Sequence, residues 1–406
     1  MPWHEPRAAR NWAGILAPSM DNNRLSNPFD TVIDRRGFHA SKWQKYAGRD
    51  VLPFWVADMD FAAPPFILAA INERLQHPVL GYTRTPDELT AAFLGWLERN
   101  YAWQVPEQWL VWLPGVVTGF NLAARAVAEP GGAIMIPTPI YYPFLATPDN
   151  AQQQGIRVPL VKDGRRWVMD FDAMAAACTA ETRLLMLCNP QNPTGRAYSK
   201  AELTTLAEFC IERDLYLCSD EIHSSLLLDQ DARHTPIASL GPDIAKRSIS
   251  LYAATKTYNI PGLSCAVAVI PDPKLRRAFR NARVGLVPDM GPLTFAAATA
   301  AFADTGPWVD ELLDYLRGNH ALVQQVAGAR MTPVEATYLA WIDLRDLGFA
   351  QPAAELEAYG LGLSEGAQFA GPGFVRFNFG CPRTTLNEGL RRLESALAAL
   401  EHRAER

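Results

Sequence analysis

The sequence predicts an α/β protein with a large domain built on a mostly parallel, mixed sheet between helices, and a smaller α+β domain. Three observations predict this fold class. Short apolar runs alternate with helical patterns between residues 109 and 270, as in parallel sheets covered on both faces. Beyond about residue 300 the alternation stops, and long helical patterns surround a few strands. The 406 residues are also enough for two separate hydrophobic cores.

The N-terminal residues before the large domain divide into an extension and a structured segment. Residues 1–26 contain no apolar signal core of sufficient length and are expected to form a loose extension, with Met20 as a candidate for the natural start. The stretch "VLPFWVADMDFAAPP" (51–65) opens with a short apolar strand and stops at two prolines. We assign residues 27–65 to the smaller domain.

The large domain is expected over residues 66–304. Apolar residues recur at three and four positions in its helices, and Ser199 with Glu202 forms a capping box at the start of one of them. The expected helices cover 66–76, 87–101, 118–128 and 199–214, and the expected strands cover 109–113, 133–137, 156–160, 183–190, 215–221, 248–254 and 264–270.

The C-terminal residues 305–406 are predicted to complete the smaller domain. A long helical region over 307–328 joins the two domains. Strands follow at "TYLAWIDL" (337–344) and "FVRFNFG" (374–380), and the chain ends in an amphipathic helix over 385–406. This arrangement places the two ends of the chain in one α+β domain.

Composition excludes several classes of protein. Hydrophobic residues make up 49% and charged residues 20%, as in soluble globular proteins. No apolar run approaches the roughly 18 residues of a membrane helix. The net charge of -5 and the scattered basic residues speak against a nucleic-acid partner.

The cysteines and histidines indicate neither disulfides nor a metal site. Six cysteines lie far apart without a CxxC pair, so we interpret them as reduced core residues of a cytoplasmic protein. The seven histidines form no metal-binding pattern, so no metal is expected.

Lys256, in "SLYAATKTYNIPGLSCAVAVI" (250–270), raises the question of its function, because it lies at the edge of an apolar core. A buried ammonium is costly, so the group loses its proton, finds a partner or takes part in chemistry. The alternative is a lysine whose stem packs while its amine reaches water.

Polar residues follow five predicted strands, at the edge where ligands bind in open α/β sheets. These residues are Gly115 to Gly119 ("GVVTG"), Tyr141 ("TPIYYPF"), Asn189 and Asn192 ("NPQNPTG"), Asp220 and His223 ("SDEIH"), and Lys256 ("ATKT"). Each motif alone is more often structural: a turn, a cap or a packed aromatic ring. Their common placement at strand ends favours a binding site.

The residue types in this set indicate pyridoxal 5'-phosphate (PLP). A lysine can form a Schiff base with its aldehyde. Asp220 can keep the ring nitrogen protonated, Asn192 can donate to the phenolic oxygen, and the Tyr141 ring can cover the cofactor. The loop that opens a helix at residue 115 offers backbone N–H groups to a phosphate.

The order and spacing of these motifs resemble the fold-type I PLP-dependent enzymes, the aspartate aminotransferase superfamily. Within it, "LPFWVADMDFAAPP", "GYTRTPDELTAAFLGWL", "SDEIHSSL", "KTYNIPGL" and "FVRFNFGCPR" are similar to the cystathionine β-lyase-like C–S lyases. The resemblance extends from about residue 27 to the C-terminus.

The resemblance implies roles for individual residues. Lys256 would be the Schiff-base lysine and the base at Cα, Asp220 would pair with the pyridinium nitrogen, and Arg376 would bind the substrate α-carboxylate. The residues implied at the remaining cofactor positions are Tyr141 on the ring, Asn192 on the phenolic oxygen, Val116, Val117 and Thr118 on the phosphate, and Tyr82 on the phosphate of a neighbouring subunit. Arg376 could also simply point to solvent, but its neighbours are apolar.

Three positions depart from the aminotransferase pattern. Ser264 replaces an arginine that often binds phosphate, His223 replaces a tyrosine beside the cofactor, and Ala253 replaces a hydroxyl residue. Thr255 is therefore expected to supplement the phosphate contacts.

The resemblance implies a PLP-dependent β-lyase that cleaves cystathionine or cysteine S-conjugates to a thiol, pyruvate and ammonia. Transamination by a class I/II aminotransferase is the alternative, because both reactions share their first steps. A regulatory binding protein on the same fold is a third hypothesis. A cytoplasmic homodimer, with Tyr82 contributed across its interface, is also implied.

Overall fold

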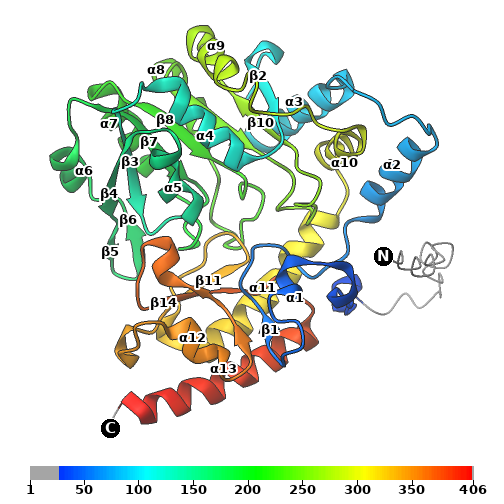
Figure 1. Ribbon diagram of the computed structural model, residues 1–406, viewed down its shortest axis with the longest axis vertical. Helices are drawn as coiled ribbons and strands as arrows, with labels where there is room; N and C mark the ends of the chain where they lie inside the picture. Colours follow the sequence, from blue (N-terminus) through cyan, green and yellow to red (C-terminus); the bar gives the residue numbers. More distant parts are fainter. Residues whose placement is uncertain (1–26, 405–406) are drawn as a thin grey trace, which may run out of the picture.

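The computed structural model describes residues 27–404 of the chain. The predicted extension over residues 1–26, with Met20, lies outside the described residues. Figure 1 shows a larger part that contains the main sheet and a smaller part below it that contains β11, β14, α12 and α13. Helix α11 (Trp308–Ala327) runs from one part to the other, as predicted for residues 307–328.

The larger part is built on a seven-stranded sheet in the order β2-β10-β9-β8-β7-β3-β4. Its strands are β2 (Leu110–Leu113), β3 (Ala133–Thr138), β4 (Gln154–Pro159), β7 (Thr182–Cys188), β8 (Tyr216–Asp220), β9 (Ser248–Tyr252) and β10 (Ala266–Val269). Strand β10 is antiparallel to both of its neighbours, and the other pairs are parallel. The prediction of a mostly parallel, mixed sheet is confirmed.

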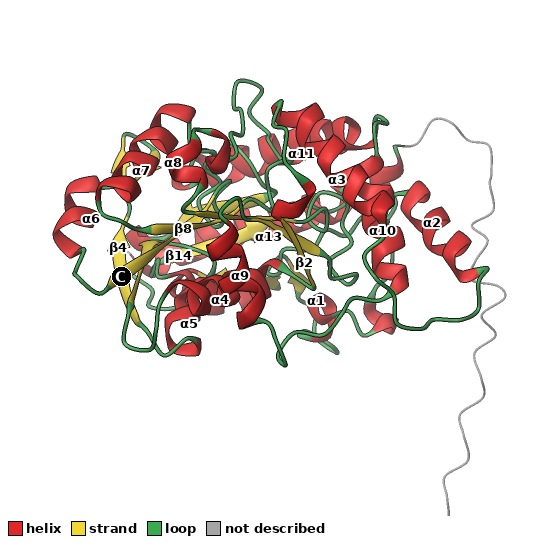
Figure 2. Ribbon diagram, turned by 90° about the horizontal axis from the view of Figure 1, so that it is seen from above, coloured by secondary structure: helices red, strands yellow, loops and turns green. Residues whose placement is uncertain are grey.

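Helices cover both faces of this sheet (Figure 2), because its strands are apolar on both sides. Along β7, Met186 packs with the helices of one face, whereas Leu185 and Leu187 pack with those of the other. The helices on the first face are α4 (Val116–Val127), α5 (Tyr142–Asn150) and α9 (Pro273–Ala282). Those on the second are α2 (Pro65–Leu75), α3 (Asp87–Tyr101), α6 (Phe171–Ala177), α7 (Lys200–Glu212), α8 (Pro242–Ala245) and α10 (Pro292–Ala303). The capping box of Ser199 and Glu202 at α7 is confirmed.

The smaller part joins residues from both ends of the described chain. Its three-stranded antiparallel sheet has the order β11-β14-β13. The helices and strands of this part, including those of the sheet, are α1 (Ser41–Gln44), β1 (Leu52–Pro53), β11 (Leu339–Asp343), α12 (Pro352–Glu357), β12 (Leu361–Gly362), β13 (Ser364–Glu365), β14 (Phe374–Asn378) and α13 (Arg383–Ala404). Phe29, Phe54 and Phe61 share one buried core with Leu386 and Leu393 of α13. The exact domain boundaries at residues 65 and 304 stay a prediction.

The short strand predicted at residue 51 is present as β1, which pairs in parallel with β12. It spans two residues, because the chain then leaves the ladder. From Trp55 to Met59 the backbone carbonyls accept hydrogen bonds from side chains instead. This irregular path brings the N-terminal segment to the end of the main sheet.

Several elements lack a clear sequence pattern and were not predicted. The hairpin of β5 (Val161–Asp163) and β6 (Arg166–Val168) is short and largely exposed, so it shows no apolar alternation. Its turn contains Gly164 at a φ of +59°, a conformation that glycine adopts without strain. Helix α10 is rich in alanine and apolar on most sides, so it has no amphipathic stripe.

The structure adds three observations on cysteines, metals and membranes. All six cysteines are free, and five of them are buried. Within residues 27–404, no group of three or more His, Cys, Asp or Glu side chains is arranged to hold a metal ion. None of the helices in the described part of the chain combines the length and apolar character of a membrane span.

Candidate active site

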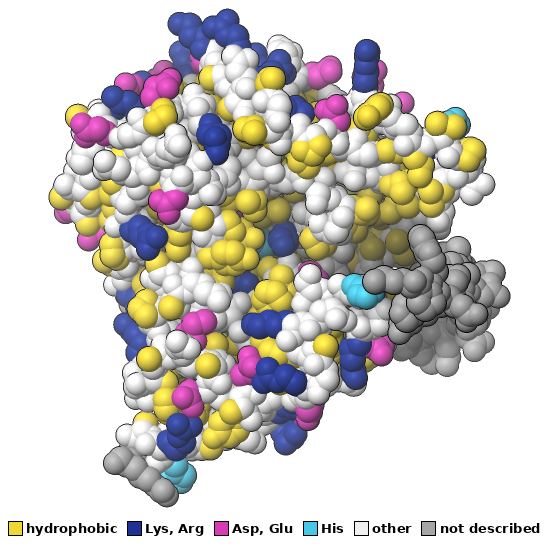
Figure 3. Space-filling model, in the orientation of Figure 1, with side chains coloured by type: hydrophobic (Ala, Val, Ile, Leu, Met, Phe, Trp, Pro, Cys, Tyr) yellow, Lys and Arg dark blue, Asp and Glu magenta, His cyan; other side chains and the backbone are white. Residues whose placement is uncertain are grey.

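Five strands of the main sheet deliver residues to one cavity of about 280 Å³ at their carboxyl ends. The nine sequence-predicted residues that line it are Val116, Val117, Thr118, Tyr141, Asn192, Asp220, His223, Thr255 and Lys256. Figure 3 shows a hollow between the two parts of the molecule, with basic side chains visible inside it. The alternation of strands and helices therefore gathers residues that are 140 positions apart in the sequence.

Lys256 follows β9 in a turn whose flanking Thr255 and Thr257 are buried. Its Nζ donates a hydrogen bond to the backbone carbonyl oxygen of Ala57 at 2.6 Å. Burial is the main reason that the pKa of Lys256 falls to about 8, and the positive charge of Arg376 contributes. The amine thus lines a cavity, and its lowered pKa makes the unprotonated form far more accessible near neutral pH than in an ordinary lysine.

Asp220 is the last residue of β8, and its main-chain carbonyl accepts the N–H of Asn189 at 2.9 Å. Its Oδ1 accepts the backbone N–H of Ile222 at 3.1 Å. Burial raises the pKa of Asp220 to about 7, although this N–H and the charge of Lys256 oppose the rise. A further cation in the cavity would favour the ionised carboxylate.

The raised pKa of Asp220 predicts how the stability of the cofactor-free protein depends on pH. Because the pKa of Asp220 is raised to about 7 on folding, its stabilising contribution is complete below its ordinary pKa and is lost as pH rises towards 7. Asp220→Asn removes this loss, so the stability of the variant relative to wild type should increase by about 3 kcal/mol between pH 5 and pH 8. Denaturant unfolding at both pH values measures the difference.

The control for this experiment is Asp243→Asn, which changes an exposed carboxylate in α8. Its effect on unfolding should be the same at both pH values. An Asp220→Asn effect that is equally independent of pH would contradict the assignment of a buried, largely protonated carboxyl group.

Arg376, in β14 of the smaller part, contacts the cavity residue Asn192. It is 2% exposed, and its Nη1 donates to Asn192 Oδ1 at 2.8 Å. Its Nη2 donates to the Trp55 carbonyl at 2.7 Å, and its guanidinium lies 4.6 Å from the centre of the Phe369 ring. Burial lowers the pKa of Arg376 to about 10.

No carboxylate of residues 27–404 forms an ion pair with Arg376, and its Nε is buried without a hydrogen-bond partner there. A buried charge without a counter-ion is unfavourable. The arrangement therefore suits an anionic ligand. The bond to Asn192 also occupies the carbonyl oxygen of that amide, which leaves its NH₂ group as a donor towards the cavity.

Tyr141 and His223 border the cavity on two further sides. The Tyr141 ring is partly buried beside Tyr142, with ring centroids 5.1 Å apart. His223 is 2% exposed, and burial followed by the charges of Lys256 and Arg376 lowers its pKa to about 3. Its Nδ1 is buried without a hydrogen-bond partner among the described residues, so a polar group is missing beside it.

The start of α4 supplies the anion-binding end of the cavity. Gly115 precedes the helix without a side-chain cap, so the N–H groups of its first turn are free for a ligand. Gly119 has a different role, because a Cβ there would lie 2.8 Å from the Leu251 side chain of β9. One glycine of "GVVTG" thus permits close packing of the helix on the sheet. Ser264, in the place of an expected arginine, also lines the cavity.

Arg376 contacts the cavity residue Asn192 but does not itself line the cavity. Tyr82 is the predicted residue that the single chain leaves away from the cavity. It lies in the loop between α2 and α3, and its side chain is fully exposed. Sequence reasoning also missed several cavity residues, namely Ala57, Pro114, Cys188, Ile222 and Pro261. Ala57 belongs to the conspicuous "VADMD" stretch, which was the available signal.

The residues present suit PLP. The cavity combines a lysine with a lowered pKa, a buried carboxyl group, an amide donor, an aromatic ring and the N-terminus of a helix. The unpartnered His223 Nδ1 and Arg376 Nε are consistent with polar groups of a cofactor and substrate. The aldehyde, ring nitrogen, phenolic oxygen, ring face and phosphate of the cofactor thus each have a suitable partner in this chain.

Comparison with known proteins identifies the family of the chain and several of its relatives. Residues 49–393 match the family described as Aminotransferase class I and II. The chain is 36% identical to cystathionine beta-lyase PatB of Bacillus subtilis (strain 168), over 91% of this chain and 100% of that protein.

Solved structures that are similar to this chain cover most of its length. The crystal structure of OvoB is 44% identical with a TM-score of 0.89, covering 91% of this chain and 99% of that one. Cystalysin from Treponema denticola, whose structure contains PLP, is 29% identical with a TM-score of 0.87, covering 92% and 99%.

Proposed function

Because the chain belongs to the aminotransferase class I and II family, we propose that it is a PLP-dependent carbon–sulfur β-lyase. Its substrate is an L-amino acid with a sulfur substituent at Cβ, such as cystathionine or another cysteine S-conjugate. The products are a thiol, pyruvate and ammonia. The observation that carries the proposal is that Lys256 and Asp220 line one cavity, while Arg376 donates a hydrogen bond to Asn192 of the same cavity.

The cofactor, when bound, supplies an electron sink that makes the Cα proton of an amino acid acidic. Asp220, ionised beside a protonated ring nitrogen, holds that nitrogen in its charged form. Asn192 would donate to the phenolic oxygen, and the Tyr141 ring would cover one face. The first turn of α4 would bind the phosphate, supplemented by Thr118, Thr255 and Ser264.

Arg376 binds the substrate α-carboxylate, which fixes the Cα–H bond relative to the cofactor. Lys256 would hold the cofactor through its amine, and the same amine would accept the Cα proton of the substrate. The Cβ–S bond then breaks, and the sulfur leaves with the bonding electrons as a thiolate. Water completes the conversion of the remaining carbon skeleton to pyruvate and ammonia. A positioned base of this kind contributes about 10²- to 10⁴-fold to the rate.

Transamination is the second candidate, because the family includes aminotransferases and the same residues support its first steps. The two reactions differ in whether a leaving group departs from Cβ or a proton returns to the cofactor. The relatives named as lyases favour elimination here.

The deciding experiment is incubation of the purified, PLP-loaded protein with cystathionine, followed by pyruvate and thiol assays. Release of both in equal amounts, without an added keto acid, is the expected result. Amino-group transfer that requires a second keto acid, with no free thiol, would replace the lyase by the aminotransferase.

We further propose a cytoplasmic homodimer in which Tyr82 reaches the phosphate of the neighbouring subunit. Around Tyr82, the side chains of Leu75, Val79 and Leu80 are exposed by 44%, 64% and 55%. Apolar side chains gathered in this way suit coverage by a second subunit. Six free cysteines fit a reducing compartment.

Tyr82→Phe tests the dimer proposal. Loss of one hydrogen bond to a charged phosphate should weaken PLP binding by about 10- to 100-fold, with the dimer intact by sedimentation. Tyr216→Phe, at the other end of β8 from Asp220, is the control. Unchanged PLP affinity in Tyr82→Phe, or a monomer with normal affinity, would refute the interface role.

A further inference from the structure

One backbone segment, residues 55–60, contacts both cationic side chains of the candidate site. The Trp55 carbonyl accepts Arg376 Nη2 at 2.7 Å, and the Ala57 carbonyl accepts Lys256 Nζ at 2.6 Å. The Tyr338 hydroxyl donates to the same Ala57 oxygen at 3.0 Å. The position of this segment therefore helps to determine where the lysine amine points.

The segment is tied to the two elements that carry these cations. Asn259, three residues after Lys256, accepts from the Met59 N–H and donates to the carbonyls of Met59 and Phe61, at 2.8–2.9 Å. Asn378, two residues after Arg376, donates to the carbonyls of Val56 and Asp58 at 2.6 and 2.8 Å. The lysine turn and the arginine strand are thus connected through one segment.

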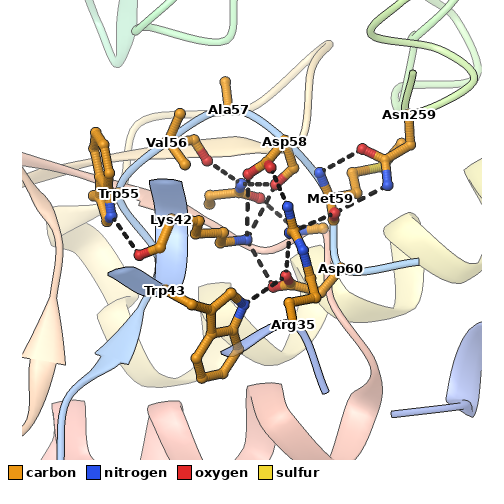
Figure 4. A network of polar contacts seen from close by, with 12 residues as sticks. Arg35, Lys42, Trp43, Trp55, Val56, Ala57, Asp58, Met59, Asp60 and Asn259 are labelled. Carbon is orange, nitrogen blue, oxygen red and sulfur yellow. Dashed lines mark hydrogen bonds and ion pairs between the residues drawn. The ribbon is translucent and has the colours of Figure 1, made fainter. Parts of the chain in front are cut away.

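Two carboxylates of the segment, Asp58 and Asp60, form a cluster of charged side chains with Arg35 and Lys42 (Figure 4). Lys42 is 1% exposed and donates to Asp60 Oδ2 at 2.7 Å and to the Asp58 carbonyl at 3.0 Å. Arg35 bridges the two carboxylates at 2.5 and 2.6 Å. Burial would raise the pKa of Asp60, but Lys42 and Arg35 together lower it.

The two carboxylates of this cluster differ in how they are satisfied. Both oxygens of Asp60 accept hydrogen bonds. Asp58 uses Oδ2 for Arg35, whereas its Oδ1 is buried without a hydrogen-bond partner among the described residues. The Nζ of Lys42 lies 4.0 Å from this oxygen, and the Asp58 side chain is 18% exposed. The negative charge of Asp58 is therefore less fully compensated by hydrogen bonds than that of Asp60.

The negative charge of Asp58 interacts electrostatically with Lys256, whose Nζ donates to the carbonyl of the adjacent residue Ala57. The charged and titratable groups that act on or face the amine are Asp58, Asp220, Arg376 and His223. Burial lowers the pKa of Lys256, and Asp58 is the strongest of the charges that oppose this lowering. Asp58 lies outside the residues that line the cavity.

We propose that Asp58 is a positioning residue for Lys256: clamped by Arg35, it holds the Ala57 carbonyl against the amine and keeps a negative charge near it. The inference rests on the proposed function, because it assigns Lys256 the proton transfer at Cα. When the amine accepts the Cα proton it becomes an ammonium, and the carbonyl and the charge of Asp58 stabilise that form. The Asp58 side chain acts through the backbone and the amine, because it does not line the cavity.

Two variants give opposite results if this inference holds. Asp58→Asn removes a negative charge, so the pH midpoint at which Lys256 loses its proton should fall by about one unit. Arg35→Gln leaves Asp58 charged but without its partner, so the midpoint should rise. In both variants kcat should drop about tenfold while KM changes less than threefold, because neither substitution removes a hydrogen-bond partner of Arg376.

The midpoint is measured on the cofactor-free full-length protein. Trace acetylation with acetic anhydride over pH 6–10 and mass spectrometry of the Lys256 peptide report the unprotonated fraction. Asp50→Asn is the control, because Asp50 is an exposed ion-pair partner of Arg392 in the same N-terminal region. A variant that unfolds at a lower temperature than the wild type is labelled at a temperature where circular dichroism shows that it is folded, beside wild type at the same temperature.

Midpoints of Asp58→Asn and Arg35→Gln that coincide with that of Asp50→Asn would overturn the inference, as would shifts in the same direction. These measurements do not depend on turnover. A wild-type protein that releases no pyruvate would therefore reject the proposed lyase function separately.

Discussion

Replacing Lys256 with alanine should reduce pyruvate release from cystathionine by about 10⁴-fold or more. The substitution removes the covalent attachment of PLP and the base that accepts the Cα proton, and the base alone accounts for about 10²- to 10⁴-fold. The absorbance band near ~420 nm expected for lysine-bound cofactor should also disappear. The amine of Lys256 has no substitute, because the cavity contains no second lysine.

Borohydride reduction followed by peptide mass spectrometry locates the attachment directly. In wild type, the mass of reduced PLP should appear on the peptide that contains Lys256. Lys246→Ala, at an exposed lysine near the end of α8, should retain the band, the labelled peptide and full activity. Substantial activity in Lys256→Ala, or a label on another lysine, would remove the basis of the proposed function.

The sequence was most informative where chemistry and strand ends coincide. Asp220 ends β8 and Lys256 follows β9, and both lie at the sheet edge that the alternation of strands and helices predicts. Parallel strands force their carboxyl ends together, so a linear pattern was enough to predict proximity. The buried carboxyl and the depressed lysine pKa then follow from their common burial.

The contribution of the N-terminal segment could not be predicted in this way. Ala57 contacts Lys256 across 199 positions in the sequence through a backbone carbonyl, and no residue-type pattern records such a contact. Lys42 and Asp60 look like ordinary surface charges in the sequence, yet both are buried against each other. Long-range pairing of an irregular segment depends on the whole fold, not on local periodicity.

Arg376 combines both situations. Its alternating apolar neighbours predicted a buried strand, which β14 confirms. The missing counter-ion became evident from the structure, where its partners are an amide, a carbonyl and a hydroxyl. Neutral acceptors leave the charge of the guanidinium uncompensated, and its Nε–H is still without a partner among the described residues, so a carboxylate remains a favourable ligand for it.

Arg376→Gln should therefore lower kcat/KM for cystathionine by about 10²- to 10⁴-fold, because two charge-assisted hydrogen bonds are lost. The PLP absorbance should persist, since Arg376 is proposed to contact the substrate and not the cofactor. Arg376→Lys should recover little activity, because an ammonium cannot copy the two-pronged geometry.

Inhibition by small ligands separates carboxylate binding from general disruption of the cavity. Propionate should inhibit wild type competitively and lose that effect in Arg376→Gln, whereas the uncharged propionamide should bind both proteins equally weakly. Arg392→Gln, which breaks ion pairs with Asp50 and Glu388 outside the cavity, should preserve propionate inhibition. If propionate still inhibited Arg376→Gln at the wild-type concentration, the substrate carboxylate would have to bind elsewhere, and the buried charge of Arg376 would need a different explanation.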